Sequence, residues 1–152
     1  MSSIGAVIDY YESGMEAMQK KRYSWAARYF LVCSYHYEYG ELPFFMSRVK
    51  EYGEDAMSKY DDCLEKLSKE ERQVLEKILR QCKHGNWRNR ASLINDTVAE
   101  EQTKEAIEEA EKELASFSQQ DSSENMEKIK KKIQDLQDWL KWIQNKRKET
   151  GQ

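Results

Sequence analysis

Apolar residues recur at intervals of three and four along most of this 152-residue chain. That spacing places them on one face of an α-helix, whereas the strict alternation that marks a half-buried strand is almost absent. Polar or glycine-containing breaks divide the pattern into about six helical segments. They cover roughly 4–20, 24–39 and 43–67, and the last three begin near residues 68, 96 and 121. We therefore predict an all-α protein.

The segments group into two parts with different patterns. Residues 1–85 hold about four helices and are predicted to form an N-terminal helical bundle, followed by a basic connector over 86–95. Residues 96–149 hold two long helices, which we predict to pair as an antiparallel, coiled-coil-like helical hairpin, and 150–152 form a tail. The apolar positions of the last helix follow the spacing of a coiled-coil seam: Met126, Ile129, Ile133, Leu136, Leu140 and Ile143.

Charge favours pairing of the last two helices. Residues 96–113 hold eight acidic and two basic side chains, whereas 124–149 hold eight basic and five acidic ones. A connection of about seven residues favours neighbouring helices over distant partners. The same seam can also join two chains, so a homodimer through the C-terminal helices is the alternative.

Two serines carry signals for the start of a helix. Ser68 with Glu71 matches a capping box, in which each side chain bonds the other residue's backbone amide. Ser24 follows the polar Lys-Lys-Arg stretch and is predicted as the N-cap of the second helix.

The second predicted helix is rich in aromatic residues, with seven among residues 21–40. Because its apolar residues lie on opposite sides, one interpretation is a helix buried between two neighbours. The alternative is a surface for a protein partner, since Trp and Tyr dominate interface hot spots. The candidate partner-binding residues are Trp25, Tyr29, Tyr35 and Tyr39.

Residues 8–40 resemble one unit of a tetratricopeptide-type helix pair. The family's small residues, aromatics and packing alanine are matched in order by Gly14, Tyr23, Ala26, Phe30 and Cys33. The sequence departs from the family at Glu38, where the family places a proline, and no second unit follows at the family's period. The resemblance implies a packed helix pair that binds a peptide or protein in a groove.

Composition and motifs argue against several function classes. The chain is 35% charged with a formal net charge of −3, and no stretch approaches the 18 apolar residues of a membrane span, so we expect a cytoplasmic protein that does not bind membranes. Its six dispersed glycines form no phosphate-binding motif, and its two histidines offer few groups for acid–base chemistry. We predict a protein that is not an enzyme and has no cofactor.

Three cysteines without a CxxC pair indicate reduced thiols rather than a disulfide framework. Cys33 and His36 share a helical face and would complete a zinc site if they met Cys82 and His84 in space. Lone cysteines on apolar faces are more often core residues, so no metal site is predicted.

A basic stretch over 77–95 contains no acidic residue. Its bases surround a tryptophan, a combination that suits a phosphate backbone and stacked bases. The candidate nucleic-acid contacts are Arg80, Lys83, Trp87, Arg88 and Arg90. The competing interpretation is that these bases cap helix ends and pair with the acidic fifth helix.

These observations favour a non-enzymatic helical protein-interaction module, such as an adaptor, an inhibitor or a regulatory subunit. A small chain of this kind would suit a microbial accessory or mobile-element protein. A nucleic-acid-binding accessory protein that uses 77–95 is the alternative.

Overall fold

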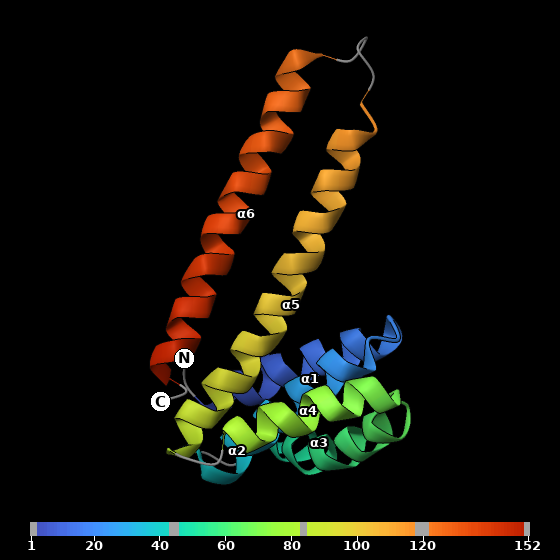
Figure 1. Ribbon diagram of the computed structural model, residues 1–152. Helices are drawn as coiled ribbons and strands as arrows, with labels where there is room; N and C mark the ends of the chain where they lie inside the picture. The colour runs from blue at the N-terminus through green and yellow to red at the C-terminus, as the bar shows by residue number, and fades with distance from the viewer. Residues whose placement is uncertain (1–2, 43–45, 83–84, 118–121, 151–152) are drawn as a thin grey trace. The chain divides into compact units, whose positions relative to one another are not determined.

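The computed structural model describes residues 3–42, 46–82, 85–117 and 122–150. These residues confirm the all-α prediction, because every regular element among them is a helix (Figure 1). The chain divides into two compact units, unit 1 over Met1–Asn95 and unit 2 over Asp96–Gln152. The helices are α1 (Ser3–Gln19), α2 (Tyr23–Tyr39), α3 (Ser47–Glu65), α4 (Lys69–Gln81), α5 (Trp87–Ala115) and α6 (Ser123–Thr150).

In unit 1 the aromatic-rich helix α2 is central. It packs against both α1 and α3, which also contact each other. Its buried side chains include Phe30, Val32 and Cys33, and the core extends to Val7 of α1 and Ala56 of α3. Phe30 and Val32 lie on opposite sides of α2, so the middle of this helix is buried between two neighbours, as the first interpretation of its sequence predicts.

Two glycines let the first three helices approach closely. A Cβ on Gly14 of α1 would lie 2.7 Å from the ring of Phe30 in α2, and one on Gly53 of α3 would overlap the ring of Tyr37. Real Cβ atoms do not approach carbon this closely, so each aromatic ring occupies the space a side chain would need. Gly14 and Phe30 both belong to the tetratricopeptide-like pattern, and here they touch.

The turn between α1 and α2 differs from the prediction. Lys21 has a φ of 58°, the left-handed conformation usually taken by glycine after a helix. The amides of Lys21 and Arg22 close the helix by donating to the carbonyls of Met18 and Ala17. Ser24 is not the N-cap, which is Arg22. The hydroxyl of Ser24 instead accepts a 2.7 Å hydrogen bond from Arg28, a buried guanidinium.

The start of α4 is as predicted. The Ser68 hydroxyl accepts from the Glu71 amide at 3.1 Å, and the Glu71 carboxylate accepts from the Ser68 amide at 3.0 Å, which confirms the capping box. Leu75 and Ile78 of α4 enter the core of unit 1, whereas Val74 is 48% exposed.

The predicted connector over 86–95 is instead the beginning of α5. The helix starts at Trp87, where the Asn86 side chain accepts a 2.9 Å hydrogen bond from the Asn89 amide. Ala91 and Ile94 are buried in the core of unit 1. The prediction was wrong because a stretch without acidic residues suggests a basic loop, whereas these residues are helical and bury Ala91, Leu93 and Ile94 while Arg88 stays exposed.

Unit 2 contains the remainder of α5 and α6, which run antiparallel (Figure 1). On α6 Ile129 and Ile143 are buried, whereas the seam positions between them are half-buried. Polar contacts join the two helices near the C-terminal end of α6. Lys146 lies 3.0 Å from Asp96, a carboxylate that is only 7% exposed.

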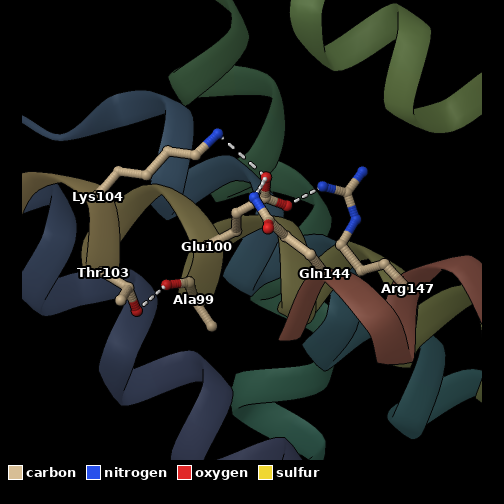
Figure 2. A network of polar contacts seen from close by, with 6 residues as sticks. All are labelled: Ala99, Glu100, Thr103, Lys104, Gln144 and Arg147. Carbon is tan, nitrogen blue, oxygen red and sulfur yellow. Dashed lines mark hydrogen bonds and ion pairs between the residues drawn. The ribbon is translucent and has the colours of Figure 1, made fainter. Parts of the chain in front are cut away.

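Glu100 of α5 is the centre of a second polar contact in unit 2 (Figure 2). Its carboxylate pairs with Arg147 of α6 and with Lys104, which lies 3.1 Å away on the next turn of α5. Gln144 donates to the same carboxylate at 3.4 Å. Although burial acts to raise the pKa of Glu100, these hydrogen bonds outweigh it and lower that pKa below its usual value.

Among the residues described, no helix combines the length and the apolar character needed to cross a membrane.

Candidate protein-interaction surface

Tyr10 of α1 begins a series of ring contacts in unit 1. Its ring stacks on Tyr29 of α2, with centroids 6.4 Å apart and planes inclined by 29°. It also stacks on His36 of α2 at 5.7 Å and 17°. Rings at this separation attract each other beyond the burial of their surface, so these three hold one another in place.

The series continues from His36 to α5 and back to α2. The ring of Trp87 meets His36 edge to face at 5.0 Å and 86°. Tyr39 lies 6.5 Å from Trp87 and 6.4 Å from Tyr35. We call the connected set the aromatic run: Tyr29, Tyr10, His36, Trp87, Tyr39 and Tyr35.

Two predicted nucleic-acid contacts lie beside this run. The guanidinium of Arg88 lies over the Trp87 ring, 4.8 Å from its centroid, and Arg88 is exposed. Arg90 is half-buried, and its positive charge acts on Tyr35, whose pKa is nevertheless raised because burial dominates. The aromatic run together with Arg88 and Arg90 is named the aromatic–basic surface.

The exposure of this surface is graded. Tyr39 is 52% exposed, whereas the other rings of the run are half-buried. Burial, and then the charge of Arg88, lower the pKa of His36. The His36 ring is therefore neutral at pH 7, which suits a position between two aromatic rings.

The remaining predicted residues lie elsewhere. Trp25 is half-buried under Arg22, whose guanidinium is 3.8 Å from the ring centroid. Arg80 is exposed on α4, and Lys83 lies outside the described residues. The structure thus joins three predicted partner-binding tyrosines to three of the predicted nucleic-acid contacts, in a grouping that the sequence did not predict.

The hypothetical zinc ligands do not form a site within the described residues. No group of three or more His, Cys, Asp or Glu side chains is placed to hold a metal there, and His84 lies outside this part of the chain. The Cys33 thiol donates to the Val7 carbonyl at 3.3 Å, and burial raises its pKa to about 12. Cys33, Cys63 and Cys82 are all buried, and none of them is in a disulfide.

Sequence reasoning missed one exposed aromatic pair, in unit 2. Trp139 and Trp142 of α6 stack with centroids 5.0 Å apart and planes inclined by 12°. They are 50% and 54% exposed. Their three-residue spacing is visible in the sequence, but the longer apolar seam dominates the pattern of the same helix and masks this second stripe beside it.

Comparison with known proteins finds no relative: no family model matches the chain, and neither the curated proteins nor the solved structures contain a match. The tetratricopeptide-like pattern of residues 8–40 stays a resemblance.

Proposed function

We propose that this chain is a non-enzymatic protein-interaction module, acting as an adaptor, an inhibitor or a regulatory subunit through the aromatic–basic surface. The observation that supports this most is the convergence of Tyr35, Tyr39 and Trp87 beside two arginines. Trp, Tyr and Arg are the residue types that most often contribute large binding energies at protein interfaces.

The ring contacts also reduce the side-chain entropy that would be lost when a partner binds. Tyr39 and Trp87 already contact each other, and Trp87 is held by His36 on one side and Arg88 on another. A partner would then lose little side-chain entropy on this side of the interface. The exposed guanidinium of Arg88 suits a protein that presents a carboxylate next to an apolar anchor.

The test is capture of a partner by the intact chain and by matched variants. Tyr39→Ala and Arg88→Glu change the proposed surface, and Val74→Ala removes a similarly exposed apolar side chain from α4. We expect the first two variants to lose a partner that the wild type and Val74→Ala retain, with all melting temperatures similar. Equal capture by all four proteins would contradict the proposal.

A nucleic-acid-binding function is the second candidate, supported by the stacking of Arg88 on Trp87. Phosphate contacts release counterions, so affinity for single-stranded RNA or DNA should fall steeply with salt and with Arg88→Gln plus Arg90→Gln. Fluorescence anisotropy with a labelled oligonucleotide measures this. Salt-insensitive or absent binding at about 10 µM protein would eliminate this candidate, because non-specific binders reach that range.

We further propose that the protein acts in the cytoplasm. Three buried cysteines outside any disulfide suit a reducing compartment, where disulfides rarely persist.

A further inference from the structure

Unit 2 carries an exposed aromatic pair of its own, Trp139 stacked on Trp142. Both rings are about half exposed, at 50% and 54%, and they lie beside the apolar seam of α6 rather than in it. Leu140 and Ile143 occupy the seam positions next to them and are more buried. Single exposed apolar side chains are normal on a protein surface, whereas contiguous exposed apolar groups mark interaction sites more often.

A charged side chain lies beside the pair. Lys146 places its ammonium 5.6 Å from the Trp142 ring centroid and 3.0 Å from the buried Asp96 carboxylate of α5. The ion pair with Asp96 positions Lys146 beside Trp142. Trp142 in turn stacks on Trp139. A preordered aromatic pair binds with a smaller entropic cost than two free side chains.

The residues around the pair form a stripe along α6 at intervals of three and four, which places them on one helical face. The stripe has charges at both ends and the two tryptophans in the middle. All of its side chains are exposed except that of Lys146, which is partly exposed. In chain order it consists of Lys132, Asp135, Trp139, Trp142, Lys146 and Glu149.

The sequence of charges and tryptophans along this stripe is complementary to the same sequence read in the opposite direction. In an antiparallel pair of α6 helices with a two-fold axis between Leu140 and Lys141, Trp139 faces Trp142 of the partner subunit. Asp135 then faces Lys146 of the partner subunit, and Lys132 faces Glu149 of the partner subunit. Every charged position meets its opposite, whereas a parallel, in-register pair would place like charges together.

We infer that the chain forms a symmetric homodimer through this α6 stripe, with the four tryptophans of two copies packed around the two-fold axis. The occupant of the surface is therefore a second copy of this chain. The contact extends over residues 132–149, or ~27 Å of helix, so it is a small interface and the dimer should be concentration-dependent. This inference does not depend on the proposed function, which uses unit 1.

Sedimentation equilibrium of the intact chain between about 5 and about 200 µM, a range suited to small interfaces, tests the dimer. We expect the average mass to rise toward two chains for the wild type and to stay at one chain for Trp139→Ala/Trp142→Ala. Val74→Ala, which removes an exposed apolar side chain from unit 1, should dimerise as the wild type does. A wild type that stays monomeric, or a tryptophan double variant that still dimerises, would overturn the inference.

Charge reversal tests the antiparallel register. Lys132→Glu alone places two acids opposite each other at both ends of the dimer, and it should weaken association about tenfold. Combining Lys132→Glu with Glu149→Lys in one chain restores opposite charges and should return association to within about threefold of the wild type. These positions are exposed, so folding should be unaffected, which circular dichroism verifies. Failure of the second change to rescue the first would rule out this register.

Discussion

In unit 1 apolar and aromatic side chains close a core around α2, whereas in unit 2 most of the apolar seam of α6 stays half-buried and ion pairs join the helices. Apolar burial stabilises a fold in a way that salt and pH barely change. Ion pairs that involve carboxylates depend on both. We therefore expect unit 1 to hold most of the stability and the hairpin to open first. Variants in each unit test this difference.

The largest expected effect is in the core of unit 1. Phe30 is fully buried, meets Tyr11 edge to face at 5.7 Å and fills the space beside Gly14. Phe30→Ala should reduce the free energy of unfolding by about 3–5 kcal/mol, a large part of the stability of a small domain. Denaturation in urea measures this.

Thiol labelling identifies which unit has opened. All three cysteines are buried in unit 1, and burial raises the pKa of Cys63 to about 11. Phe30→Ala should shift labelling to lower urea, whereas Ile143→Ala, a buried change in α6, should leave it nearly unchanged. Equal shifts for both variants would show that the two units unfold together.

The next effect is in the hairpin and depends on pH. The pKa of Glu100 is lowered in the folded protein. The ionised carboxylate therefore adds to the free energy of unfolding above the unfolded pKa of about 4.3, and this added stability is lost as pH falls through the folded pKa. Glu100→Gln leaves Arg147 and Lys104 without their carboxylate and should cost about 3 kcal/mol near pH 7.

The pH dependence provides the matched comparison. Helical content between pH 7 and pH 3 should decrease more for the wild type than for Glu100→Gln, because only the wild type loses this charge. Similar curves for the two proteins would mean that Glu100 does not control the acid sensitivity of the hairpin.

A smaller effect is expected where α1 meets α2. Gly14→Ala adds a methyl group 2.7 Å from the Phe30 ring and should cost about 2 kcal/mol, despite the better helix propensity of alanine. In a Phe30→Leu background the same change should cost clearly less, because the ring no longer fills that space. A double-mutant cycle from urea denaturation compares the two costs, and equal values would exclude the proposed clash.

The smallest expected effect is a gain in stability. Lys21 holds a φ of 58°, which costs a residue with a Cβ about 1 kcal/mol relative to glycine. Lys21→Gly should therefore raise the free energy of unfolding by about 1 kcal/mol. Lys20→Gly, one position earlier, is the control and should give no gain. A loss of stability in Lys21→Gly would contradict the proposed strain.

Local signals were the most predictable part of this fold. The capping box of Ser68 and Glu71 was predicted because both partners lie within one turn. The left-handed turn at Lys21 was not predicted, since no glycine marks it. The start of α5 at Trp87 was missed because its apolar residues point to several sides in unit 1 and give no single helical face.

The sequence predicted separate residues of the candidate surface but not their grouping. Tyr35 and Tyr39 were selected for their residue type, and Arg88 and Arg90 for their charge, as rival sites. Their convergence depends on Trp87 packing beside His36, a contact between residues about fifty positions apart that no local pattern encodes. The spacing of Trp139 and Trp142 is a local feature of the sequence, but their exposure depends on how α6 packs and required the structure.

The most direct test of the proposed function is hydrogen exchange on the intact chain, free and with the protein it captures. We predict slower exchange on binding at the C-terminal end of α2, around Tyr35–Tyr39, and at the start of α5, around Trp87–Arg90, since binding there covers the aromatic–basic surface. Protection should disappear in Tyr39→Ala at equal concentrations. Protection confined to α4 or to α6, with these two segments unchanged, would contradict the account.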